Sequence, residues 1–477
     1  MFFPKGNKKP VPIKSLSKGV SWSLIANVVS TLLGALAVLV LPKYLSVENY
    51  GYYQLYLLYT GLTTLLAFGI PESVYLELGG RKSTKLTNKN VALQYFCLFL
   101  LDLMLYGGFV VNICLSGELN NRNITILWVC ASGFINCIRN YALFILQARG
   151  YIKQYSISVV LERTISLIPI MGATILGYSD ILVLIGFDFL GRFVSFFYVW
   201  IQYRYIKSFE LRKGSKFDLG YLISLIPSGL QLMIASYTST IIISVVRACI
   251  ERNWSIEIFA QVSLLISVAT MISRLINAVA IPLFPALKTS DYNRDVLFYS
   301  KGSFAISFIY FIALAGMPLV STLLGWWLPQ YQYALSMAIL LVPLSLFDGK
   351  MSLLVMTMCK SYRKEKFLLL LNIISLALML IGIVLVMHTT HNIIQLLVAV
   401  VVVFYARCLI GELYLAKMHK LTAKRLIIWD TASLGLVLFC WSSYSEFLPC
   451  VSLALLSLFL FANVQNVKEL FAFRKAK

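Results

Sequence analysis

The sequence lacks the motifs that mark nucleotide-driven pumps and zinc enzymes. It contains neither a Gly-rich phosphate loop of the GxxxxGK(S/T) type nor an HExxH motif, and only three histidines occur, His388, His391 and His419. The nine cysteines include no CxxC pair and are scattered in or beside apolar segments, so neither a disulfide framework nor a metal site is expected. An ATP-driven pump or a zinc enzyme is therefore not expected, and no cofactor is predicted.

Acidic residues and long polar segments are also scarce. The chain has 20 Asp and Glu against 41 Lys and Arg, and 59% of its residues are hydrophobic, with a mean hydropathy of +0.82. This composition excludes a water-soluble core and leaves no room for the extramembrane domain of a membrane glycosyltransferase. The net charge of +21 is explained by orientation on an anionic inner leaflet, so no nucleic acid is expected as a partner. The sequence indicates a polytopic membrane protein that is not an enzyme.

Apolar runs of about 20 residues, the length of a helix that crosses the hydrocarbon, recur about fourteen times. The expected fold class is therefore an all-α polytopic membrane protein, with a count of twelve spans and two re-entrant or interfacial segments as the alternative. The predicted spans are 19–41, 53–77, 91–116, 124–147, 155–178, 181–203, 219–246, 256–286, 302–324, 332–358, 367–387, 392–416, 426–442 and 446–464.

Lysine and arginine gather in alternate connections between these spans. With the N-terminus inside, 31 of the 41 cations lie in inside segments, and only Lys43, Arg122, Arg247 and Arg252 lie in outside connections. Cytoplasmic loops retain positive charge, so both termini are predicted to be cytoplasmic. The basic residues 1–18 lead into a full-length span without a small-residue cleavage site, which favours an uncleaved first helix.

Three segments resemble the polysaccharide exporters. Residues 17–23, SKGVSWS, and 41–55, LPKYLSVENYGYYQL, are similar to the first helix and first outer loop of this family. Residues 146–155, LQARGYIKQY, are similar to its inner loop between spans four and five. The family comprises the Wzx-like lipid-linked oligosaccharide flippases of the multidrug/oligosaccharidyl-lipid/polysaccharide (MOP) exporter superfamily. The number of helices, the short loops and the break near 206–217 agree with it over essentially the full length.

The resemblance implies two six-helix bundles in a V-shaped arrangement that works by alternating access. It implies transport of a polyprenyl-pyrophosphate-linked oligosaccharide from the inner to the outer leaflet of a bacterial cytoplasmic membrane, for surface polysaccharide biosynthesis. Membrane lipids and a polysaccharide polymerase or chain-length protein are the other partners considered. The corresponding parts are a basic N-terminus (1–18), an N-terminal bundle (19–205), a linker (206–217), a C-terminal bundle (218–417), two additional helices (418–465) and a cytoplasmic tail (466–477).

Six cations remain inside the predicted spans, where charged residues are rare and normally face an interior or a water-filled path. Arg274 is the leading ligand candidate, because its span has no acidic residue from 258 to 287 and a guanidinium binds a diphosphate through paired hydrogen bonds. Small polar residues on spans one and seven could contact sugar hydroxyls. The predicted substrate-binding residues are Arg274, Arg139, Arg192, Arg163, Lys350, Arg407, Asn27, Ser23 and Gln231.

Structural salt bridges are the alternative role for most of these cations. Asp188 and Arg192 are four residues apart and can meet on one helix face, whereas neighbours such as Glu162 and Arg163 point apart and need partners on other helices. Asp102 and Asp188 are the candidates for proton or sodium coupling. For each of them, a static interhelical hydrogen bond is the alternative.

Other functions remain open. A multidrug or cation antiporter of the same superfamily would carry a buried coupling carboxylate, but the first and seventh spans have no charged residue over 19–41 and 220–245. A flippase for the peptidoglycan precursor would carry charged residues on its first helix, which this sequence lacks. A non-transporting membrane subunit of a glycan assembly complex is the third alternative.

Overall fold

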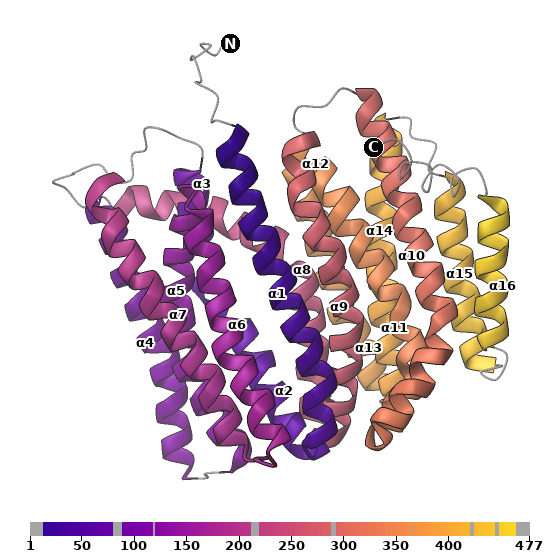
Figure 1. Ribbon diagram of the computed structural model, residues 1–477, viewed down its shortest axis with the longest axis horizontal. Helices are drawn as coiled ribbons and strands as arrows, with labels where there is room; N and C mark the ends of the chain where they lie inside the picture. The colour runs from indigo at the N-terminus through magenta and orange to yellow at the C-terminus, as the bar shows by residue number, and fades with distance from the viewer. Residues whose placement is uncertain are drawn as a thin grey trace. The chain divides into compact units, whose positions relative to one another are not determined.

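The computed structural model describes residues 13–79, 88–117, 120–210, 219–287, 292–362, 364–419, 424–443 and 448–463. Within these ranges the regular elements are all helical, and the predicted all-α fold class is confirmed (Figure 1). The helices of the first part of the chain are α1 (Ile13–Tyr44), α2 (Val47–Leu62), η1 (Thr63–Ala67), α3 (Ile70–Leu78), α4 (Asn88–Ser116), α5 (Asn121–Ala148), α6 (Ile152–Ile175) and α7 (Ile181–Glu210).

The second part continues in the same way, with short connections between long helices. Its elements are α8 (Leu219–Asn253), α9 (Ile256–Leu287), α10 (Tyr292–Trp327), η2 (Pro329–Tyr331), α11 (Gln332–Lys350), η3 (Met351–Met356), α12 (Thr357–Ser361), α13 (Glu365–Thr389), α14 (Ile393–His419), α15 (Lys424–Ser443) and α16 (Leu448–Ala462).

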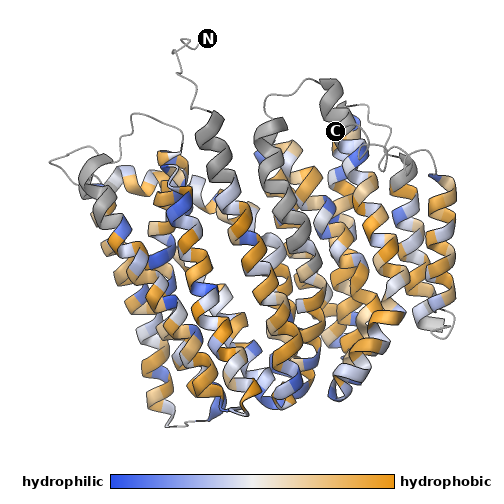
Figure 2. Cartoon of the chain, in the orientation of Figure 1, coloured by the Kyte–Doolittle hydropathy of each residue, from blue (hydrophilic) through white to orange (hydrophobic). Residues whose placement is uncertain are grey.

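These helices make the chain a multi-span membrane protein. Among the described residues, 10 helices are long and apolar enough to cross a membrane, and the bent pair Val47–Ala67 and Ile70–Leu78 brings the number to 11. Shorter apolar helices occupy Ile256–Met271, Ile427–Phe439 and Pro449–Ala462. Hydrophobic residues run along the helices (Figure 2), and many large ones, such as Leu32, Met104 and Leu385, are exposed, as is expected of a surface that faces lipid. The number of crossings and the side on which the termini lie stay predictions.

The chain divides into two compact units. Unit 1 consists of Met1–Ala37 and Tyr59–Met233, and unit 2 of Val38–Leu58 and Ile234–Lys477. The boundaries fall inside α1, α2 and α8, so each of these helices contributes residues to both units. The bundle limits expected from the sequence, 19–205 and 218–417, follow loops instead, and they stay a prediction.

In unit 1, α5 is the central helix. It packs against α3, α4, α6 and α7, and α6 packs along α7. Apolar side chains of several helices, among them Val74, Leu98 and Tyr141, form one buried cluster around it. Because α5 is surrounded in this way, its buried polar residues, such as Asn136 and Arg139, face other helices rather than lipid.

The second span is broken between η1 and α3. Phe68 and Gly69 have φ values of 47° and 74°, and the helices on either side are bent by 58°. The positive φ at Gly69 suits glycine, and a Cβ there would lie 2.4 Å from the backbone nitrogen of Leu230 in α8. Pro71 then opens α3 at a position where its missing N–H costs nothing. The span predicted over 53–77 is therefore two helical pieces rather than one.

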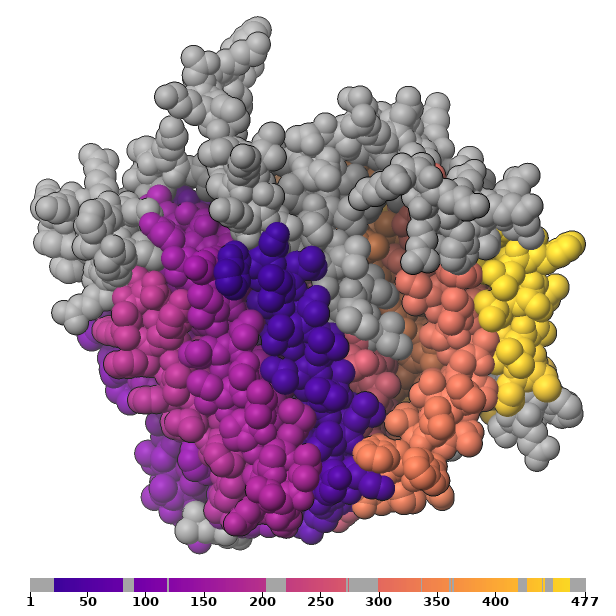
Figure 3. All heavy atoms as spheres, viewed as in Figure 1, coloured from indigo at the N-terminus to yellow at the C-terminus, as the bar shows by residue number. Residues whose placement is uncertain are grey.

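In unit 2, α11 is the most buried helix. It packs against α9, α10 and α14, and it passes at Lys350 into the π-helical turn η3. Helix α16 packs along α10, as the yellow and salmon side chains in Figure 3 show. A π-helical turn inserts an extra residue into the helix and is frequent at functional positions, here directly after a buried lysine.

Candidate functional site

Charged side chains of α5, α6 and α7 form a continuous ion network in unit 1. Arg139 Nη1 lies 2.6 Å from Glu162 Oε2, and Arg192 Nη1 lies 3.7 Å from Glu162 Oε1. Arg192 Nε also donates to Asp188 Oδ2 at 2.6 Å. The predicted pairing of Asp188 with Arg192 is confirmed, and Glu162 finds its partners on other helices, as its position next to Arg163 required.

Neutral polar groups complete this network. Arg139 donates to Ser195 Oγ at 3.2 Å and to Asn136 Oδ1 at 3.0 Å, and the hydroxyls of Ser158 and Ser195 are 2.8 Å apart. Gly191 allows α7 to approach α6 closely, since a Cβ there would lie 2.8 Å from the carbonyl oxygen of Glu162. Two arginines and two carboxylates balance in charge, which suits a network that holds three helices together.

A second buried ion cluster lies in unit 2 around Lys350, which is 0% exposed. Its ammonium donates to Asp430 Oδ2 of α15 and lies 3.7 Å from Glu412 Oε1 of α14. The Tyr299 hydroxyl donates to Glu412 at 3.1 Å, and Ser307 donates to Asp430 at 3.0 Å. The cluster therefore joins α10, α11, α14 and α15 and places two carboxylates around one lysine.

Arg407 of α14 has a different environment. It is 2% exposed, and its guanidinium donates twice to Asn372 Oδ1, at 2.7 and 3.1 Å, and to Ser239 Oγ at 2.7 Å. Asp348 of α11 lies within electrostatic range, but no carboxylate among the described residues forms a salt bridge with Arg407. Of the predicted cations that the structure describes as buried, Arg407 alone is held only by neutral groups.

Of the remaining predicted residues whose side chains the structure describes, none forms a salt bridge with these clusters, although Arg163 lies within electrostatic range of Glu162. Arg163 is half-buried on α6, and Ser23, Asn27 and Gln231 are half-buried on α1 and α8. Arg274 belongs to α9, but its side chain lies outside the described residues. The structure thus separates the predicted ligand set into one ion network, one lysine cluster, one isolated arginine and several dispersed residues.

Asp102 is also buried, at 0% exposed, and its carboxyl group lies against the Cys137 thiol of α5. A static interhelical hydrogen bond, here to Cys137, therefore stays the alternative to a coupling role for Asp102. Asp188, the other coupling candidate, is instead bound by Arg192. The two aspartates, equivalent in the sequence analysis, occupy opposite electrostatic environments.

Three buried acids escaped the sequence analysis: Glu72 on α3, Glu412 on α14 and Asp430 on α15. Each lies within a predicted span, where an ionisable residue is by itself a reason to expect a function or a partner. Their signal in the sequence is the same as that of the buried cations, a charged residue within an apolar span. Among the described residues, no three His, Cys, Asp or Glu side chains are grouped as metal ligands.

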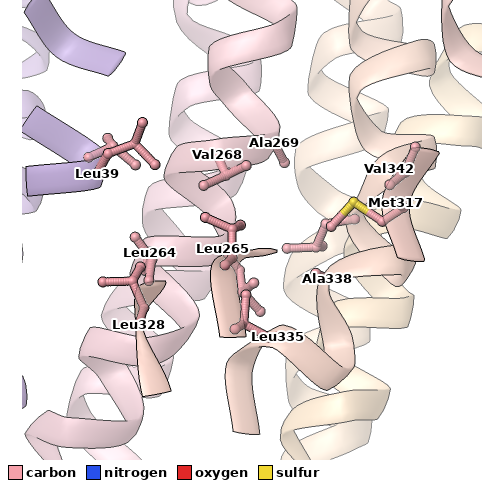
Figure 4. Close-up of a pocket in the computed structure, with 13 residues that line it drawn as sticks. Leu39, Leu264, Leu265, Val268, Ala269, Met317, Leu328, Leu335, Ala338 and Val342 are labelled. Atoms are coloured by element: carbon pink, nitrogen blue, oxygen red, sulfur yellow. The ribbon is translucent and has the colours of Figure 1, made fainter. Parts of the chain in front are cut away.

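A small cavity of about 40 Å³ lies in unit 2 between the end of α1 and helices α9, α10 and α11. Its walls are apolar, with Leu39, Leu265, Val268, Met317 and Leu335 among the side chains that surround it (Figure 4). Such a site has no group that could bind a diphosphate or a sugar hydroxyl. The candidate polar contacts therefore lie elsewhere in the chain.

Several solved structures have a fold similar to that of this chain. The chain is similar to the lipid II flippase MurJ in an inward closed conformation, with a TM-score of 0.55 and 16% identity over 94% of this chain and 99% of that one. It is also similar to an inward-facing MATE family multidrug resistance transporter of the MOP superfamily, with a TM-score of 0.58 and 13% identity over 87% and 98%. A MOP superfamily transporter from Pyrococcus furiosus matches with a TM-score of 0.50 and 12% identity over 92% and 100%. At these identities the similarity is one of fold, and the fold is that of MOP superfamily transporters.

The sequence itself identifies the family. The polysaccharide biosynthesis protein family matches residues 16–291, more than half of the chain, and the chain belongs to this family. A search of curated proteins gave no significant match. The membership confirms the resemblance to the polysaccharide exporters, and the proteins of similar structure are transporters and flippases rather than enzymes.

Proposed function

We propose that the protein is a flippase that carries a polyprenyl-pyrophosphate-linked oligosaccharide from the inner to the outer leaflet of a bacterial cytoplasmic membrane. The membership in the polysaccharide biosynthesis protein family carries this proposal. The fold, which is also that of the lipid II flippase MurJ, supports it. A diphosphate and a sugar chain cannot cross hydrocarbon unaided, since desolvation of charges and hydroxyl groups is too costly.

We assign the diphosphate contact first to Arg274 and Arg407. Arg139, Arg192 and Lys350 are neutralised by carboxylates, so their charges are already used in holding helices together. Arg407 has only amide and hydroxyl partners, which an anionic ligand can replace without breaking a salt bridge. Arg163 and the polar residues Ser23, Asn27 and Gln231 remain proposed contacts to the glycan.

The test is the analysis of lipid-linked sugars in a deletion strain. Loss of a flippase should cause lipid-linked intermediates to accumulate on the inner leaflet and surface glycan to disappear. Unchanged lipid-linked sugars and surface glycan would refute the proposal. Lost drug resistance with unchanged surface glycan would instead identify a multidrug antiporter, a function that the similarity of fold to the MATE transporter also allows.

The residue assignment has its own test in the complemented strain. Arg274→Ala should reproduce the accumulation at normal protein level, and Arg274→Lys should retain part of the export, because a single ammonium replaces only part of a bidentate contact. Arg122→Ala, which removes an exposed cation at the start of α5, is the matched control and should export normally. Normal surface glycan in Arg274→Ala would refute the phosphate contact while leaving the flippase function in place.

A further inference from the structure

The Lys350 cluster of unit 2 contains two acids but a single cation. The Lys350 ammonium donates to Asp430 Oδ2 and lies 3.7 Å from Glu412 Oε1, and no other described cation lies at salt-bridge distance from either acid. Lys350 is 0% exposed, and each of the two acids is 3% exposed. If both acids were ionised, the cluster would bury one net negative charge, and the removal of such a charge from water costs several kcal/mol.

One face of α10 presents three hydroxyl groups to this cluster. Tyr299 donates to Glu412 Oε1 at 3.1 Å, and Ser307 donates to Asp430 Oδ1 at 3.0 Å. Ser303 lies one turn from each of these donors, and residues four apart share a helix face, so its hydroxyl lies between them. Ser303 is 1% exposed, and the described residues supply no hydrogen-bond partner to its Oγ. A buried hydroxyl with unused hydrogen-bonding capacity therefore lies beside the two acids.

The other groups around the two acids do not supply the missing positive charge. The Cys408 thiol, one turn before Glu412 on α14, and the Tyr310 phenol of α10 lie within electrostatic range, and the phenol is paired with the Ser433 hydroxyl. The element η3 packs against both α10 and α14 and contains no ionisable residue. Arg407 lies within electrostatic range of the Cys408 thiol, but its guanidinium donates to groups on α8 and α13.

We propose that the Lys350 cluster binds one proton at neutral pH, and that Glu412 carries it. The ammonium contacts Asp430 directly and is farther from Glu412, so Asp430 is the ionised partner of the lysine. Of two neighbouring acids that share one cation, one keeps its proton, because like charges at short distance repel each other. A neutral Glu412 can accept from Tyr299 at one oxygen and donate from the other, and Ser303 is the available acceptor.

The proton would determine the net charge at a junction of four helices, α10, α11, α14 and α15. With the proton bound, the cluster is neutral; without it, two carboxylates share one ammonium in the membrane interior. Lys350 directly precedes the π-helical turn Met351–Met356, so this change in charge occurs at an irregular point of the chain. Glu412 thereby becomes a candidate for proton coupling in addition to Asp102 and Asp188. The use of the proton in transport rests on the proposed function, whereas the proton site does not.

The test uses the full-length protein in lipid nanodiscs without any glycan. Infrared spectra of the wild type at neutral pH should contain a protonated carboxyl component that is lost in Glu412→Gln. Asp430→Asn should lose the same component, because Lys350 then pairs with an ionised Glu412 and no additional proton is needed. Glu257→Gln, which removes an exposed acid of α9 in the same unit, is the matched control and should leave the component unchanged. A component of equal size in the wild type and Glu412→Gln, or its retention in Asp430→Asn, would overturn the proposal.

Two further measurements test the ligand and its acceptor. The component should be equal in sodium chloride and in choline chloride at the same ionic strength; its loss in sodium alone would overturn the proton in favour of a sodium ion. Ser303→Ala should shift the component to higher frequency, because the acid loses its acceptor, whereas Ser321→Ala on the same helix should not. An unchanged frequency in Ser303→Ala would overturn the role of Ser303. None of these measurements depends on substrate, so failure of the flippase assignment in the deletion strain is distinguishable from failure of the proton site.

Discussion

Replacement of Lys350 by methionine should destabilise unit 2 strongly. In the native protein the ammonium is the sole cation at salt-bridge distance from Asp430 and Glu412 among the described residues. Methionine has a similar length and fills the volume without charge. The two carboxylates would then be buried on α14 and α15 with hydrogen bonds from Tyr299 and Ser307 but without compensation of charge.

The expected loss follows from the burial of the whole cluster. Removal of one partner from a buried ion pair costs about 3–5 kcal/mol, because the other charge is left uncompensated. Lys43→Met is the matched control in the same unit: Lys43 donates to the Trp327 carbonyl at 2.9 Å and lies over its ring, but it is exposed. An exposed contact of this kind is worth about 1 kcal/mol or less. The loss in free energy of unfolding should therefore be several-fold larger for Lys350→Met than for Lys43→Met.

A second substitution separates lost charge from lost packing. Asp430→Asn in the Lys350→Met background removes one of the stranded charges, so the double variant should be more stable than Lys350→Met alone. An interaction energy of about 0.5–3 kcal/mol is expected from the double-mutant cycle. The assay is denaturant unfolding of the purified protein in mixed micelles, followed by tryptophan fluorescence. The reasoning is refuted if Lys350→Met lowers the free energy of unfolding no more than Lys43→Met does, or if Asp430→Asn restores none of the stability that Lys350→Met loses.

Two further predictions concern the close helix contact and the isolated arginine. Gly229→Ala should lower the thermal unfolding temperature, because the new Cβ would lie 2.0 Å from the Gly69 carbonyl oxygen. Gly61→Ala should raise this temperature slightly, because there is open space around its Cβ. Equal effects of the two substitutions would contradict the close contact at Gly229. Arg407→Gln should reduce glycan export in the complemented strain. It should also lower the free energy of unfolding by about 1–3 kcal/mol through loss of hydrogen bonds to Asn372 and Ser239. This loss is smaller than that expected for Lys350→Met, because no carboxylate is left without its counter-ion. Export at the wild-type level would remove Arg407 from the proposed substrate contacts.

The sequence was a good guide to the helices and a poor one to the charges. Apolar length alone located α13 and α14 to within a few residues, because hydrocarbon thickness sets the length of a span. The bend at Phe68 and Gly69 escaped detection, since hydropathy does not register a change in φ. Its sequence signal, a glycine directly before Ile70-Pro71, is too common to predict a break.

Whether the partner of a buried charge can be predicted depends on how far apart the two residues lie in the sequence. Asp188 and Arg192 were predictable because a helix brings residues four apart onto one face. Lys350 and Asp430 are 80 residues apart, so their pairing depends on how α11 and α15 pack, which no local pattern encodes. The prediction of Lys350 as a substrate ligand therefore takes no account of its two carboxylate partners, Asp430 and Glu412.

The buried cations of this protein differ in whether a carboxylate balances their charge. Four of the predicted cations are buried: Arg139, Arg192, Lys350 and Arg407. The first three each have carboxylate partners that balance their charge. Among the described residues, Arg407 instead has only neutral partners at hydrogen-bond distance. A buried charge without a counter-ion costs folding free energy. Under the proposed function, the diphosphate of the substrate would supply the negative charge that the surroundings of Arg407 lack.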